Sequence, residues 1–120
     1  MKIPKIIKSN KILDNLSWFM RIGGITLWPF IIVRPYVNRF TINHEKIHIK
    51  QQQELLVIFF YILYVLEWVF GLIKYRDSKK SYYNISFERE AYQNEQNLQY
   101  INDRKLFNWI KYVYTKNNIE

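Results

Sequence analysis

The sequence contains no cysteine, and it has only three glycines, three prolines and two histidines among its 120 residues. Without cysteine the chain forms neither a disulfide nor a thiolate metal site, so any metal ligands must be histidine, glutamate or aspartate. A chain of this length fits one domain and leaves little room for a second core. We therefore expect a single domain over residues 1–120.

The charge is unbalanced, with 18 Lys and Arg against 10 Asp and Glu, a formal net charge of +8. Such a balance suits a nucleic acid, an anionic membrane surface or an acidic partner. The basic residues are scattered, and no RNP-like, helix-turn-helix or zinc-finger pattern appears, so we expect no nucleic-acid partner. The charge is better explained by basic residues that flank apolar segments near a membrane.

The first 40 residues are basic and then apolar but interrupted. Residues 1–16 predict a basic N-terminal arm, and they lack the apolar run and cleavage site of a cleavable signal peptide. Residues 25–33 are rich in β-branched and aromatic side chains. Because Pro29 cannot donate to a sheet ladder, this stretch predicts a short edge strand, with a hairpin, even a membrane hairpin, as the alternative.

The longest apolar run, residues 55–73, contains one charged residue, Glu67, and Lys74 and Arg76 follow it. Its length is close to the roughly 20 residues that cross a bilayer. A fully buried core helix is the alternative, but so short a chain has little else to cover such a helix on all sides. We expect a membrane-inserted or membrane-associated protein.

The remaining segments predict helices, so the expected fold is mainly α. A helix capped by Thr41 or Asn43 should run directly into the apolar helix, because no Gly or Pro lies between Ile42 and Phe70. Residues 81–116 read as largely soluble C-terminal helices.

The chemistry is concentrated in His44-Glu45-Lys46-Ile47-His48. Four residues make about one helical turn, so His44 and His48 project from one helix face and can share one cation. Glu45 lies beside them and can reach a metal-bound water without being a ligand itself. Two surface histidines one turn apart are the non-functional interpretation, but these are the only two histidines in the chain.

A third ligand must come from elsewhere in the chain. On an unbroken helix Glu54 would lie about 9 Å along the axis from His48, too far to share a metal, and Glu67 would lie further still. The ligand should therefore stand on a second helix, which contains Glu88 and Glu90. Glu88 shares a helix face with Tyr92 and Glu95, whereas Glu90 faces away, and spacing alone leaves both candidates open.

The pair of motifs His44-Glu45-x-x-His48-x-x-Gln51-Gln52 and Phe87-Glu88-Arg89-Glu90-Ala91 resembles the gluzincin zinc metallopeptidases. The resemblance is closer to small bacterial, often membrane-associated proteins with H-E-x-x-H-x-x-Q-Q and F-E-R-E-A, and it covers roughly residues 24–95. It implies a Zn²⁺ held by His44, His48 and Glu88, with Glu45 as general base. The gluzincin Asp that commonly orients a histidine ligand is Tyr92 here, so that role would fall to Glu95 or Glu54.

The function expected from these features is zinc-dependent hydrolysis of a peptide or protein substrate at a membrane. Tyr82, Tyr83, Arg89 and Tyr92 are candidates to stabilise the oxyanion, and the strand at 25–33 could align a substrate by edge pairing. The small size favours a cleft completed by a partner or by self-association. The alternative is a non-catalytic membrane protein in which the same residues form a structural zinc site.

Overall fold

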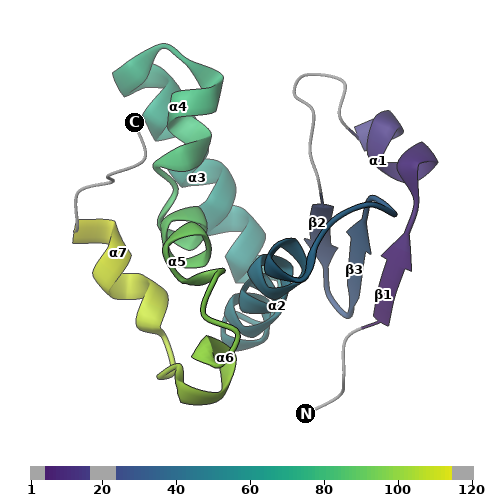
Figure 1. Cartoon of the computed structure of the whole chain (residues 1–120). Helices are drawn as coiled ribbons and strands as arrows, with labels where there is room; N and C mark the ends of the chain where they lie inside the picture. The colour runs from purple at the N-terminus through teal and green to yellow at the C-terminus, as the bar shows by residue number, and fades with distance from the viewer. Residues whose placement is uncertain (1–4, 17–23, 115–120) are drawn as a thin grey trace.

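The structure, a computed structural model, describes residues 5–16 and 24–114 of the chain. Over these residues the fold is mainly helical, as the sequence predicted, and it contains one small sheet. Helix α2 lies between the sheet and the C-terminal helices (Figure 1). The elements in chain order are β1 (Lys5–Lys8), α1 (Asn10–Leu16), β2 (Gly24–Leu27), β3 (Phe30–Val33), α2 (Arg39–Glu54), α3 (Ile58–Tyr75), α4 (Ser78–Tyr83), α5 (Ser86–Asn94), α6 (Tyr100–Asp103), the short 3-10 helix η1 (Asn108–Ile110) and α7 (Lys111–Tyr114).

The sheet has the strand order β1-β3-β2, with β3 parallel to β1 and antiparallel to β2. The stretch 25–33 is thus a hairpin and not a single edge strand. Pro29 lies in its turn, where a missing N–H costs no ladder bond, and this lets β3 be the central strand. Its residues Ile31 and Val33 are fully buried and pack with Ile49 of α2.

The N-terminal residues that we expected to form a basic arm belong to the fold from Lys5 onward. Strand β1 pairs with β3 along its whole length, in register Lys5 to Phe30 and Lys8 to Val33. Helix α1 is fixed by Arg34, which follows β3 and whose Nη1 donates to Asn10 at 3.1 Å and to Asp14 at 2.9 Å. Local composition gave no sign of this, because a parallel partner is distant in sequence.

Helix α2 begins earlier than its sequence suggested. Its N-cap is Asn38, whose Oδ1 accepts hydrogen bonds from the backbone N–H groups of Phe40 and Thr41, both at 3.0 Å. The expected caps Thr41 and Asn43 lie inside the helix. The side chain of Asn43 instead donates to the carbonyl groups of Glu95 and Asn97, at 2.7 and 3.1 Å. An Asn that looked like a local cap therefore holds the end of α5 against α2.

The expected continuity between α2 and the apolar helix is wrong. The chain turns at Leu56 and Val57, whose φ angles are 54° and 65°, a region that bulky residues rarely adopt. No Gly or Pro marks this break, so it is imposed by packing. After the turn, Phe60 of α3 forms a buried cluster with Ile85 and Phe87 from the C-terminal half.

Helix α3 is the long apolar helix, and α4 folds back against its C-terminal half. The two helices come close together at Gly71, where a Cβ atom would overlap Ser81 of α4. The Ser81 hydroxyl donates to the carbonyl of Trp68. The C-terminal residues expected as helical do form helices, but short ones, interrupted between Glu95 and Gln99 and again before η1. Trp109 of η1 packs on Phe87 with ring centroids 4.7 Å apart.

Candidate metal centre

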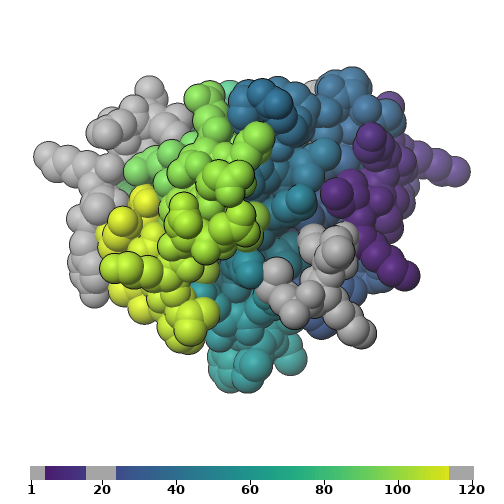
Figure 2. Space-filling model, turned by 60° about the horizontal axis from the view of Figure 1, so that its bottom comes forward, coloured from purple at the N-terminus to yellow at the C-terminus, as the bar shows by residue number. Residues whose placement is uncertain are grey.

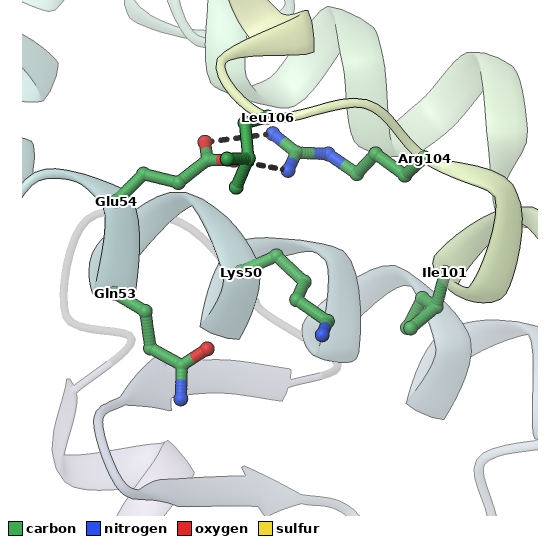
Figure 3. Close-up of a pocket in the computed structure, with 6 residues that line it drawn as sticks. All are labelled: Lys50, Gln53, Glu54, Ile101, Arg104 and Leu106. Atoms are coloured by element: carbon green, nitrogen blue, oxygen red, sulfur yellow. Dashed lines mark hydrogen bonds and ion pairs between the residues drawn. The ribbon is translucent and has the colours of Figure 1, made fainter. Parts of the chain in front are cut away.

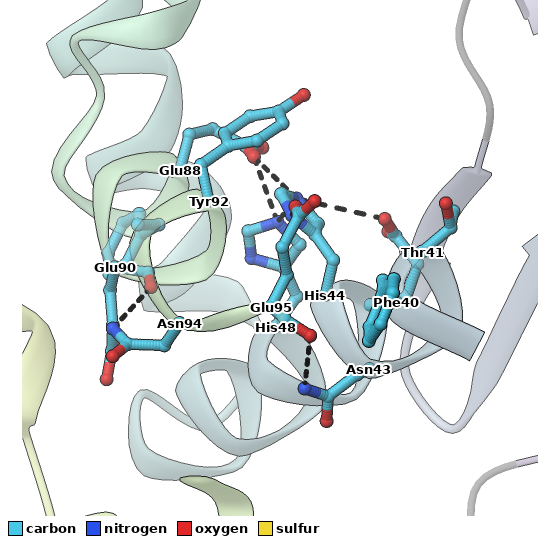
Figure 4. A network of polar contacts seen from close by, with 12 residues as sticks. Phe40, Thr41, Asn43, His44, His48, Glu88, Glu90, Tyr92, Asn94 and Glu95 are labelled. Atoms are coloured by element: carbon cyan, nitrogen blue, oxygen red, sulfur yellow. Dashed lines mark hydrogen bonds and ion pairs between the residues drawn. The ribbon is translucent and has the colours of Figure 1, made fainter. Parts of the chain in front are cut away.

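Helices α2 and α5 bring together the three side chains that the sequence singled out as ligands. His44 and His48 stand one turn apart on α2, and Glu88 faces them from the first turn of α5 (Figure 4). Glu88 Oε1 lies 3.0 Å from His44 Nε2 and 3.1 Å from His48 Nε2, and the two Nε2 atoms are 3.2 Å apart. All three side chains are buried, each exposed by 5% or less.

The outer nitrogen of each imidazole faces an acceptor. His44 Nδ1 lies 2.8 Å from Glu95 Oε1, and His48 Nδ1 lies 2.7 Å from Gln51 Oε1. The orientation of the Gln51 amide is fixed, because its Nε2 donates to the Phe87 carbonyl at 3.1 Å and to Glu90 Oε1 at 2.9 Å. Both imidazoles therefore donate outward from Nδ1 and, when neutral, present only the lone pair of Nε2 to the centre.

Two imidazole lone pairs and a carboxylate oxygen thus converge on one buried point. When both imidazoles are neutral, these three acceptors repel one another unless a cation lies between them. Tetrahedral zinc with ligand bonds near 2.0–2.2 Å places its ligand atoms about 3.3–3.6 Å apart, so the three side chains need only small shifts from the separations found here. His44, His48 and Glu88 could therefore hold a metal ion.

The electrostatics favour positive charge at the same point. Burial by itself would lower the pKa of His44, but its hydrogen bonds to Glu88 and Glu95 and the charge of Glu45 outweigh burial and raise that pKa to about 10. Burial acts against His48 too, and the charge of Glu88 raises its pKa nonetheless. Burial would raise the pKa of Glu88, yet the two histidines lower it overall.

Two residues outside the predicted set complete the surroundings of His44, His48 and Glu88. Gln51 orients His48, as described above, and Tyr64 of α3 donates from its hydroxyl to Glu88 Oε2 at 2.6 Å. This bond leaves Oε1 of Glu88 for the centre. Glu95 takes the orienting role that Tyr92 cannot fill, one of the two substitutes that the sequence offered. For Gln51 the only sequence signal was its place in the motif after His48, and nothing local pointed to Tyr64.

Glu45 lies beside the cluster without belonging to it. Its Oε2 is 3.9 Å from His44 Nε2, while its Oε1 accepts a hydrogen bond of 3.0 Å from the Thr26 hydroxyl of β2. Strand β2 comes close to α2 at this point. A Cβ atom at Gly24 would lie 3.4 Å from Glu45 Cγ and 3.1 Å from Val33 Cγ1, so a larger residue would crowd Glu45.

The other acidic candidates lie elsewhere and have partners of their own. Glu90 and Glu54 both pair with Arg104, with shortest contacts of 2.6 and 2.7 Å. Figure 3 shows the Glu54–Arg104 pair beside a surface hollow of about 520 Å³, which none of the three clustered side chains lines. Glu67 accepts from the backbone N–H and the hydroxyl of Ser86, at 2.8 and 2.6 Å, and so caps the N-terminus of α5.

Aromatic hydroxyls gather on one side of the cluster. The Tyr92 ring contacts the His44 ring with centroids 4.3 Å apart, and the Tyr92 and Tyr82 hydroxyls are 2.9 Å apart. Burial and the charge of Glu88 raise the pKa of both tyrosines, so both keep their protons and can donate. Arg89 is directed elsewhere, to Asn84 and to the Tyr112 carbonyl.

The outer edge of β2 is partly occupied. Gln52 pairs with it as a neighbouring strand would, donating to the Thr26 carbonyl at 2.9 Å and accepting from the Trp28 N–H at 2.8 Å. The Tyr61 hydroxyl also donates to the Thr26 carbonyl, at 3.1 Å. A substrate strand could therefore pair with this part of the edge only by displacing Gln52. Comparison with protein-family models, curated proteins and solved structures found no match to this chain.

Proposed function

We propose that this chain is a zinc-dependent hydrolase of peptide bonds, a gluzincin-like metallopeptidase in which His44, His48 and Glu88 hold the metal. The observation that carries the proposal is the convergence of three buried acceptor atoms whose outer partners turn their lone pairs toward one point. Two imidazoles and one carboxylate form the ligand set of catalytic zinc sites that keep a fourth position for water or substrate.

Glu45 is the proposed general base. A zinc ion held by these three side chains would supply Lewis acidity, which lowers the pKa of a bound water and polarises a carbonyl group. The Thr26 hydroxyl holds Glu45 Oε1, so Oε2 remains on the side of the cluster. From there Glu45 accepts the proton of the attacking water and returns it to the leaving amine. Tyr92 and Tyr82 are the proposed donors to the oxyanion.

A structural metal site is the second candidate, and the low exposure of the three ligands favours it. Structural zinc sites are closed, whereas catalytic sites need access for water and substrate. Glu45 distinguishes the two candidates, because a closed structural site has no use for a carboxylate that touches the cluster without joining it.

The experiment is the Glu45→Gln variant, which keeps side-chain volume and can still accept the Thr26 hydrogen bond but cannot take a proton. We expect it to bind zinc with unchanged stoichiometry and to lose hydrolysis of unfolded or membrane-tethered polypeptides by about 10²–10⁴-fold, the usual worth of general-base catalysis. Thr26→Val is the matched control, because it removes only the hydrogen bond that positions Glu45. We expect it to reduce hydrolysis less than Glu45→Gln does. Equal activity of wild type and Glu45→Gln, with zinc in both, would leave the structural site as the function.

A membrane location is part of this proposal. Helix α3 is long and apolar enough to cross a membrane, with a mean hydropathy of 1.6 over 18 residues, of which 11% are buried. A core helix of a soluble protein passes the same test of length and composition, but such a helix is mostly buried. The exposure of α3 is therefore what supports placing the protein at a membrane.

A further inference from the structure

The outward face of α3 is apolar along the whole helix. Every exposed residue between Ile58 and Ile73 is Ile, Phe, Val or Leu, and these residues recur at spacings of three and four, so they form one stripe. Ile62, Leu66 and Phe70 in this outward stripe are 50%, 60% and 70% exposed. A helix on the surface of a soluble protein carries polar residues on its outer face, and this one carries none.

The inner face of the same helix packs against the rest of the molecule. Phe60 lies in the buried cluster, Tyr64 donates to Glu88, and Glu67 caps α5. Helices α4 and α5 follow α3 in the chain and fold back beside it (Figure 1). A bilayer that enclosed α3 on all sides would therefore also enclose the charged residues of α5, at a high energetic cost. Only the outward stripe is available to lipid.

A basic group stands at the C-terminal end of the outward stripe. Lys74, Arg76, Lys79 and Lys80 are all exposed, and no acidic residue except Asp77 lies among them. The ammonium groups of Lys74 and Lys80 lie 5.2 and 5.1 Å from the centre of the Tyr75 ring. Lysine and arginine beside an apolar helix face are the arrangement that anionic lipid headgroups attract.

We infer that the outward stripe of α3 rests in the acyl layer of an anionic membrane, with α3 lying along the surface and the basic group among the headgroups. Residues in the teal range that includes α3 form the lower edge of the molecule in Figure 2. Tyr64 reaches Glu88 from the opposite face of the helix, so the metal centre lies one helix away from the lipid. If the proposed hydrolysis holds, its substrates are peptide segments at the membrane surface. The lipid contact itself does not depend on that hydrolysis.

The experiment measures sedimentation of the full chain with vesicles of phosphatidylcholine alone or mixed with phosphatidylglycerol. Wild type should bind both and prefer the anionic mixture. The double variant Leu66→Ser/Phe70→Ser should bind at least about tenfold more weakly, given the apolar area it removes. Its control is Leu106→Ser, an exposed apolar residue outside the stripe. Lys79→Gln/Lys80→Gln should weaken binding about tenfold, and only to anionic vesicles. The control Lys5→Gln/Lys8→Gln on β1 should weaken binding to anionic vesicles less.

Four results would overturn the inference. Stripe variants that bind as well as wild type, or a wild type that binds no vesicles, exclude the stripe as a lipid contact. Resistance to alkaline carbonate extraction shows a spanning helix. A dimer without vesicles that Leu66→Ser/Phe70→Ser converts to a monomer shows a second copy on the stripe. Zinc content and hydrolysis are measured on the same variants, and Glu45→Gln should still bind vesicles, so failure of the peptidase proposal is seen separately.

Discussion

Glu88 and Glu90 stand two residues apart on α5, both buried, and they are satisfied in different ways. Glu90 accepts from the guanidinium of Arg104, from the Tyr100 hydroxyl at 2.6 Å and from Gln51. Glu88 faces two imidazoles whose outer nitrogens are already directed to acceptors. The chain supplies a permanent cation on one face of the helix and none on the other. A buried carboxylate needs a cation, and at Glu88 that cation is either an imidazole of the chain that has taken up a proton or a metal ion that takes the place of the proton.

The largest expected difference between the Glu88 and Glu90 variants is in metal binding. Glu88→Gln should weaken zinc binding by about 10³-fold, because the roughly 10–16 kcal/mol of a zinc site is divided among three or four ligands. Glu90→Gln should keep stoichiometric zinc, since its partner is Arg104. Metal analysis of the purified variants, beside His44→Ala and His48→Ala, measures both effects. Zinc loss in Glu90→Gln but not in Glu88→Gln would reverse the assignment of the two faces.

The second prediction concerns stability on the Glu90 side. Arg104→Met keeps the aliphatic stem but leaves Glu90 and Glu54 buried without their cation. Breaking such a pair costs about 3–5 kcal/mol, and we expect about 3 kcal/mol because Gln51 and Tyr100 still hold Glu90. Urea denaturation at pH 7 measures the loss. The exposed Arg39→Met is the control and should change the free energy of unfolding by less than about 0.5 kcal/mol.

The same variant has a pH dependence of defined sign. Burial would raise the pKa of Glu90, but the hydrogen bonds and charge of Arg104 lower it below its ordinary value of 4.5. In wild type the pair therefore stabilises the fold above that value, and the contribution is lost as the pH falls through the folded pKa. In Arg104→Met, burial dominates and Glu90 takes up a proton at higher pH. The gap between the two proteins should narrow from pH 7 toward pH 4, and a gap that widens would contradict this account.

The sequence was sufficient to predict the arrangement of side chains where spacing along one helix decides it. His44, Glu45 and His48 lie as a helical turn requires, and Glu88 shares its face of α5 with Tyr92 and Glu95, both of which contact His44. It was insufficient where distant segments decide. The turn at Leu56 and Val57 goes against local preference and exists because α3 packs on α5. Strand β1 forms only by pairing with β3, and Asn43 has its role only because the end of α5 lies beside it.

Gln51 lies between Glu90 and His48, and it gives the smallest and most specific test. Its amide accepts from His48 Nδ1 and donates to Glu90, so the position of His48, a proposed metal ligand, depends on the Arg104 network. Gln51→Met keeps the volume and removes both hydrogen bonds. Loss of such an outer partner typically weakens metal binding by about 10–100-fold, with stoichiometry unchanged.

The matched control for Gln51 is its neighbour Gln52, which is equally buried and bonds to β2 without touching a ligand. Gln52→Met should destabilise the fold to a similar extent and leave zinc affinity near that of wild type. Chelator competition measures the affinity, and urea denaturation of the same samples measures the stability. If both variants lose zinc affinity equally, the loss comes from a loosened fold. If only Gln51→Met loses it, the orientation of His48 is what the Gln51 amide contributes.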